Sequence, residues 1–137
     1  MARTYKLFIK TGIVFYALFC LIFTALMPVT AHAAKNSVFT VTGVKVDVTA
    51  ESAVIAREKA FVQAQQNAFE QLADRLLSES QRSAFEMPDV SVISTLVNDF
   101  EITEEQLSAV RYLGTYTFRF KNDAVRNYFS GGGYTYT

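Results

Sequence analysis

The sequence predicts an α+β fold, a small antiparallel sheet of about three strands with one long helix packed on a face and two short helices. Alternating apolar and polar residues mark one strand at Ser37 to Val48 and another at Val110 to Lys121. Between them, Ala50 to about Glu79 contains neither Gly nor Pro and repeats its apolar residues at helical spacing. The segments follow one another without a regular βαβ repeat, which favours the α+β class.

The first predicted strand, Ser37 to Val48, changes the parity of its apolar residues at Gly43. One β-bulge at this glycine would bring the residues before and after it onto one face. Two short strands joined by a kink are the alternative. The apolar residues concerned are Phe39 and Val41 before the glycine, and Val44, Val46 and Val48 after it.

The long predicted helix, Ala50 to about Glu79, has Thr49 as its expected N-cap and Glu51 in its first turn. Its apolar residues recur at spacings of three, four and seven, which traces a stripe expected to face the core. Polar residues, among them Gln65, interrupt the stripe in its first half. The stripe consists of Val54, Phe61, Ala64, Ala68, Leu72 and Leu76.

Two short helices are predicted after the long one. A polar stretch, Ser78 to Pro88, ends the long helix, and Asp89 is the expected cap of a helix over Val90 to Asn98. Near the end of the chain, Asn122 or Asp123 is the expected cap of the last short helix.

The two remaining predicted strands lie next to each other in the sequence. In Asp99 to Ala109, strand periodicity would put Glu101 and Glu105 on one face. In Val110 to Lys121, Gly114 occupies an inward position, where we expect a helix or backbone to approach closely.

Residues 1–33 have the pattern of a cleavable export signal. A basic start precedes an uncharged, largely apolar run from Thr11 to Met27, and Ala31-His32-Ala33 supplies the small-x-small pattern that a signal peptidase accepts. We therefore expect an exported, periplasmic protein. The alternative is an uncleaved anchor, which would hold the rest of the chain at the membrane.

Residues 34–130 are predicted to form a single domain, and residues 131–137 a Gly-rich joint followed by a strand-like tail. Tyr134 and Tyr136 follow the glycines without an obvious core of their own, so we interpret them as candidate partner-binding residues. They would add a strand to a neighbouring sheet or to another chain. A frayed end is the equally weighted alternative.

The only Cys and the only His, Cys20 and His32, both lie in the predicted signal. Its cleavage would leave no imidazole for a Ser-His-Asp or Cys-His arrangement and no thiol or imidazole to bind zinc. The sequence also lacks a Gly-rich phosphate-binding motif. We therefore predict a protein that is not an enzyme, with no catalytic residues, no cofactor and no metal site.

The balance of basic and acidic residues indicates which classes of partner to expect. The chain has 13 basic and 13 acidic residues. Loss of Arg3, Lys6 and Lys10 with the signal would leave ten basic against 13 acidic, with no Lys/Arg cluster. Nucleic acid is therefore not an expected partner, and a membrane is one only if the N-terminal segment is kept.

The densest acidic patch consists of Asp99, Glu101, Glu104 and Glu105. We interpret it as a solvated acidic edge of the sheet. A calcium site needs about six oxygen ligands around a turn, and a carboxylate pair for acid/base chemistry must flank one bond. Ligand or calcium binding at this edge is the alternative function, and catalysis by carboxylates alone ranks below it.

Three stretches resemble a proteobacterial envelope family designated domain of unknown function 2066. They are Val44 to Ala53 with Ala56-Arg57 and Ala60, then Ala68 to Leu76, then Val110 to Phe120 with Ala124-Val125-Arg126. The resemblance implies an exported protein and supplies no catalytic residues. It also implies a naturally short form, a truncated gene or a fragment, because members usually continue into further domains. The leading expectation is a non-enzymatic module that binds or scaffolds other envelope proteins.

Overall fold

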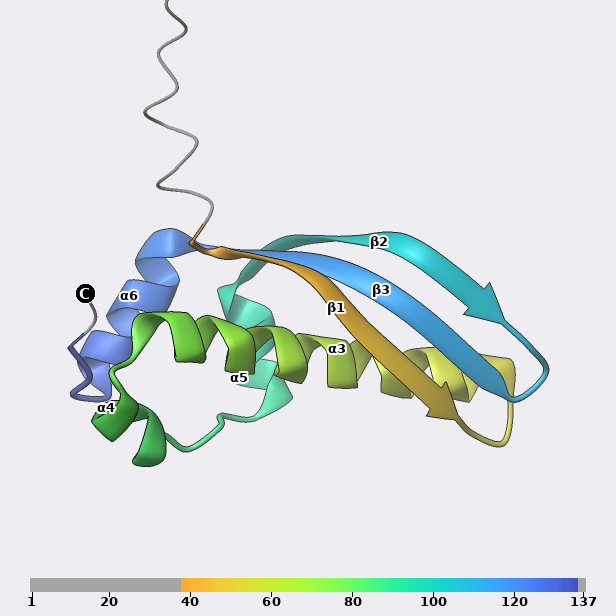
Figure 1. The fold of residues 1–137 in the computed structure, drawn as a ribbon, viewed down its shortest axis with the longest axis horizontal. Coiled ribbons are helices and arrows are strands. Elements are labelled where there is room, and N and C mark those ends of the chain that lie inside the picture. The colour runs from red at the N-terminus through yellow and green to blue at the C-terminus, as the bar shows by residue number, and fades with distance from the viewer. Residues whose placement is uncertain (1–37, 136–137) are drawn as a thin grey trace, which may run out of the picture. The chain divides into compact units, whose positions relative to one another are not determined.

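The computed structural model describes residues 38–135, which form a three-stranded antiparallel sheet with the long helix along one face (Figure 1). The elements are β1 (Thr40–Thr49), α3 (Ala53–Leu76), α4 (Glu79–Ser83), α5 (Val90–Leu96), β2 (Val97–Leu107), β3 (Arg111–Phe120) and α6 (Asn122–Gly131). Strand β3 lies between β1 and β2 and is antiparallel to both. The predicted α+β class is confirmed, with three short helices in place of two. The predicted signal, residues 1–33, lies outside the described residues.

The bulge predicted in the first strand is confirmed. Val41 pairs with Phe118 and Val44 with Tyr116, so β1 has one residue more than β3 in this interval. Gly43 has a φ of +71°, a left-handed conformation that glycine adopts without a steric penalty. The strand continues through the bulge, and its apolar residues on both sides face the core.

The N-cap of helix α3 lies three residues after Thr49, the cap predicted from the sequence. Thr49 is the last residue of β1 and pairs with Arg111, so its extended backbone belongs to the sheet. Ser52 is the N-cap instead, and its hydroxyl accepts a hydrogen bond of 3.3 Å from the backbone N–H of Ile55. The helix ends at Leu76, before the predicted Glu79, because a separate capping box at Ser78 starts α4.

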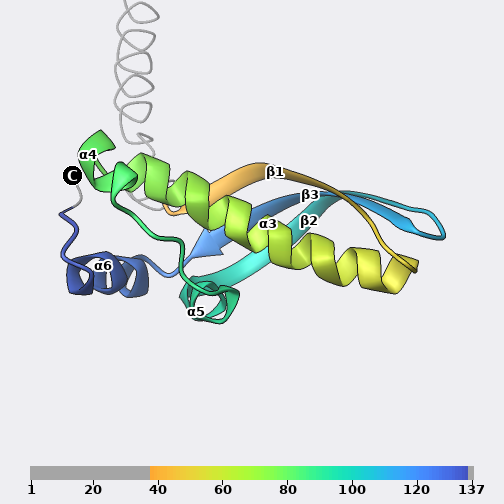
Figure 2. The ribbon, with the colours of Figure 1, turned by 90° about the horizontal axis from the view of Figure 1, so that it is seen from below.

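The face of α3 that meets the sheet is built largely from small residues. Seen from below, α3 runs along the sheet and covers it (Figure 2). From Ala56 to Ala68, alanines at every fourth position let the helix backbone approach the strands, where large aromatic side chains of β3 fill the space. The fully buried alanines are Ala56, Ala60, Ala64, Ala68 and Ala73.

The predicted stripe of α3 is correct in its second half only. Val54 is 67% exposed, because it lies about 200° around the helix from the fully buried Ala56. Phe61 is half-buried, and the polar Gln65 is buried, where its side-chain oxygen accepts a bond from Ser94. The stripe residues that are buried as predicted are Ala64, Ala68, Leu72 and Leu76.

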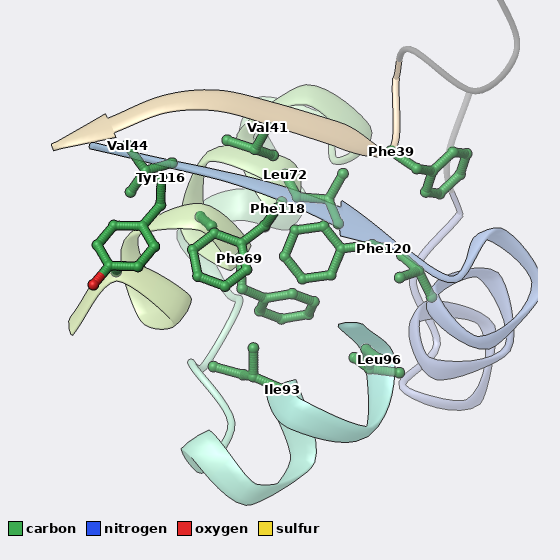
Figure 3. Packing of buried hydrophobic residues seen from close by; sticks show 14 of the residues in the cluster. Phe39, Val41, Val44, Phe69, Leu72, Ile93, Leu96, Tyr116, Phe118 and Phe120 are labelled. Atoms are coloured by element: carbon green, nitrogen blue, oxygen red, sulfur yellow. The ribbon is translucent and has the colours of Figure 1, made fainter. Parts of the chain in front are cut away.

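Phe69 of α3 lies at the centre of the aromatic part of the core (Figure 3). Its ring stacks on Phe129 of α6, with centroids 5.9 Å apart, and contacts Phe85 and Phe120. This packing joins the long helix to the last helix and to the central strand.

No helix among residues 38–135 is both long enough and apolar enough to cross a bilayer.

The ends of the short helices differ from the predictions. Asp89 is the N-cap of α5, as predicted, but its side chain makes no capping bond, and α5 ends at Leu96 because the next residue enters β2. Lys121 is the N-cap of α6 in place of Asn122 or Asp123. The side-chain oxygen of Asn122 accepts a 2.6 Å bond from Arg126 instead of capping the helix.

Candidate binding site at the edge of the sheet

Strand β2 forms one edge of the sheet. Within residues 38–135 only β3 pairs with it, so its other side is unpaired along Val97–Leu107. Figure 1 shows this edge lying beyond β3, on the side away from β1. On an edge strand, the outward N–H and C=O groups form a row that can pair with another chain. The edge of β2 is therefore a template for one more strand.

A shallow apolar groove lies between β2 and α3. Its volume is about 350 Å³, and its walls are almost wholly apolar. Phe100 stands at its edge: it is 46% exposed, and its ring centroid lies 4.8 Å from that of Phe61. The groove thus runs beside the unpaired edge and offers apolar surface to it. Its lining residues are Arg57, Glu58, Phe61, Phe100, Ile102 and Tyr116.

A pair of buried tyrosines lies beside this groove, and one of them, Tyr116, lines it. The hydroxyls of Tyr112 and Tyr116 lie 2.9 Å apart, on either side of Gly114. Burial raises the pKa of the Tyr112 hydroxyl, and its hydrogen bond with Tyr116 raises it further, so Tyr112 is neutral at ordinary pH. The close approach predicted at Gly114 is present, but the nearest groups are the rings of these two tyrosines and not a helix or a backbone.

The acidic patch is divided between the two faces of β2. Glu101 pairs with Thr117 and Glu104 with Thr115, and the register shifts between Ile102 and Glu104. After this bulge, the residues of β2 that face outward are even-numbered instead of odd-numbered. Glu101 and Glu104 therefore lie on the outer face of the sheet, while Glu105 points to the helix side. The prediction that Glu101 and Glu105 share a face is wrong, because Thr103 is the extra residue.

Arg119 on β3 binds the first two carboxylates of the patch. Its guanidinium lies 2.5 Å from Asp99 and 3.0 Å from Glu101. The bond from Arg119, with a second from Asn98, holds the pKa of Asp99 below its ordinary value. All three charged groups are about half exposed, so these ion pairs fix side-chain geometry more than they stabilise the fold.

The other two carboxylates have different partners. Glu105 forms a 3.0 Å ion pair with Arg57 of α3, at the rim of the groove. Glu104 accepts a 3.1 Å hydrogen bond from the Thr115 hydroxyl. Among residues 38–135, no cation lies within ion-pair distance of Glu104 or of Glu58 on the opposite rim. The edge therefore keeps an excess of negative charge.

No family model matches this chain. No curated protein and no solved structure matches it either. The envelope-family resemblance stays a prediction.

Ligand or calcium binding at the acidic patch stays the alternative function. Among residues 38–135, no group of three or more Asp, Glu, His or Cys side chains is placed to hold a metal ion. Arg119 and Arg57 contact three of the four carboxylates, as a bound cation would. A shallow hollow of about 340 Å³ on the outer face mixes Lys45 with Asp47 and Glu104, so it has no single charge character.

The predicted tail residues are only partly described. Gly131 is the last residue of α6, and Gly133 has a φ of +80° where the chain turns back. Tyr134 is half-buried, with its ring 5.7 Å from Phe85 and its N–H bonded to the Phe129 carbonyl at 2.9 Å. The glycines thus close the helix, and Tyr134 lies on the core outside any strand. Tyr136 lies outside the described residues.

The groove was missed in the sequence, although its residues were visible there. Phe61 lies on the predicted helix stripe, and Phe100 and Ile102 share the apolar parity of the second predicted strand. Those patterns predict burial. That β2 is an edge strand depends on the strand order β1-β3-β2, which periodicity does not supply.

Proposed function

We propose that the protein is a non-enzymatic, exported module of the cell envelope that binds other proteins by accepting one of their extended segments at the edge of β2. The observation that carries this is an unpaired strand edge beside an apolar groove in which Phe100 is half exposed. In strand addition, main-chain hydrogen bonds supply affinity, and pockets for alternate side chains supply specificity. Export rests on the pattern of residues 1–33 and on the envelope-family resemblance.

The edge of β2 is a better acceptor than the edge of β1. Phe100 of β2 is a large apolar residue with much of its surface exposed beside the groove, whereas no large apolar residue of β1 within Thr40–Thr49 is so exposed. Covering the exposed part of Phe100 would contribute on the order of 1 kcal/mol to binding. An added strand would make that contact and the main-chain bonds together.

The test compares two exposed apolar residues of the same strand. Phe100→Ser removes the groove wall, whereas Leu107→Ser changes a residue that is 58% exposed and does not line the groove. We expect partners recovered from an envelope extract by the wild-type chain to be lost with Phe100→Ser and kept with Leu107→Ser. Circular dichroism checks that both variants fold.

Hydrogen exchange identifies the mode of binding. A bound partner should slow amide exchange within Val97–Leu107 of β2, because its outward N–H groups gain acceptors, and should leave Thr40–Thr49 of β1 unchanged. Equal recovery of partners by both variants, or protection confined to β1, would contradict the proposal.

A further inference from the structure

We infer that the segment bound at the edge of β2 is basic on one face, with apolar side chains toward the groove alternating with Lys or Arg toward Glu101 and Glu104. This inference rests on the proposed function and adds the chemistry of the partner. It follows from how side chains of neighbouring strands line up and from the charges that surround the edge.

The two faces of β2 present different chemistry to a new strand. Phe100 and Ile102 lie on the groove side, and Glu101 and Glu104 lie on the outer side. A strand paired with β2 continues both faces, so its successive side chains alternate between groove and outer face. Directly opposed side chains lie about 4.5–5.5 Å apart at Cβ, close enough for apolar contacts on one face and ion pairs on the other.

The charges around the edge are unbalanced. Five carboxylates face three cations, namely the guanidiniums of Arg57 and Arg119 and the ammonium of Lys45, which lines the same outer hollow as Glu104. Asp47 in that hollow is paired with Arg111, so two negative charges remain in excess. Opposite charges across neighbouring strands attract and like charges repel, so a basic strand is favoured over an acidic one. The five carboxylates are those of Glu58, Asp99, Glu101, Glu104 and Glu105.

The same charges argue against a second copy of this chain as the occupant. If β2 paired with β2 of another copy, the carboxylates of Glu101 and Glu104 would lie opposite carboxylates of the other copy and repel them. The bulges of β2 also leave only short regular stretches, from Asp99 to Ile102 and from Glu104 to Leu107. A short basic segment of a different protein fits this edge better.

The test uses the full chain and short synthetic peptides of alternating Val and Lys. One control replaces each Lys by Glu, and a second keeps the composition but groups the Lys residues so that the two faces are mixed. We expect the alternating Lys peptide to bind about tenfold more tightly than either control, by fluorescence anisotropy. Added salt should reduce this preference, because the groups are exposed.

Matched variants assign the preference to the edge. Glu101→Gln with Glu104→Gln should reduce the preference for Lys over Glu peptide to about twofold. Glu79→Gln with Glu86→Gln makes the same change of charge in and after α4, away from β2, and should leave the preference unchanged (Figure 1).

The outcomes separate this inference from the proposed function. If the Glu peptide or the grouped peptide binds as tightly as the alternating Lys peptide, or if no peptide binds, the inference is overturned. The proposed function survives those results as long as Phe100→Ser still abolishes partner recovery. If Phe100→Ser binds partners and peptides as tightly as the wild type, both are overturned.

Discussion

Gly114 shows how the lack of one side chain shapes the core. Tyr112 and Tyr116 flank it on the same face of β3, and their hydroxyls meet at 2.9 Å. A Cβ at position 114 would lie 2.7 Å from the ring of Tyr112 and 2.8 Å from that of Tyr116. The two buried hydroxyls form a hydrogen bond with each other. This contact depends on the glycine, because a side chain at position 114 would occupy the space of the two rings.

Gly114→Ala should therefore destabilise the fold. The added methyl pushes two buried rings apart and weakens their bond, at a cost of about 1–3 kcal/mol in the free energy of unfolding. Urea denaturation measures it. Gly131→Ala is the matched control, because no atom lies within 4 Å of its would-be Cβ at the end of α6. Equal stability of the two variants would show that the rings move aside freely.

At the scale of elements, periodicity predicts which segments are strands and helices, and pairing decides where they end and which way they face. A glycine marks the bulge of β1, so Gly43 and its consequence were predictable from the sequence. The bulge of β2 falls at Thr103, which carries no such mark, so the face of Glu105 was assigned wrongly. Thr49 and Ser52 are both good caps, and only the pairing of Thr49 with β3 selects Ser52.

The close approach of α3 to the sheet yields a prediction for this helix. Ala64 is fully buried, and the next residue toward the N-terminus, Gln63, is exposed. Ala64→Leu adds volume where the helix meets the strands and should cost about 1–3 kcal/mol in the free energy of unfolding. Gln63→Leu changes a solvent-facing position of similar helix propensity and should be within about 0.5 kcal/mol of the wild type. Similar urea midpoints for both variants would contradict the packing described for α3.

At the scale of the whole molecule, the proposed function requires the edge of β2 to accept one kind of strand and to exclude others. An exposed edge with apolar surface invites pairing between copies, and charges and bulges are the usual protection. Here two register shifts and the row of carboxylates lie on the edge that carries Phe100. Under the proposed function the carboxylates would serve both roles, because the charge that attracts a basic segment also repels a second copy.

This double role predicts self-association when the charge is removed. Glu101→Gln with Glu104→Gln should increase the fraction of dimer over the wild type at equal concentration, measured by sedimentation velocity, because the repulsion between two β2 edges is lost. Raising the salt concentration should move the wild type in the same direction by screening. Adding Phe100→Ser should reverse the increase by removing the apolar contact, and Glu79→Gln with Glu86→Gln should sediment as the wild type does. A dimer fraction that the Glu101 and Glu104 changes leave unaltered would mean that the bulges alone protect the edge, and that its carboxylates serve only to select the partner.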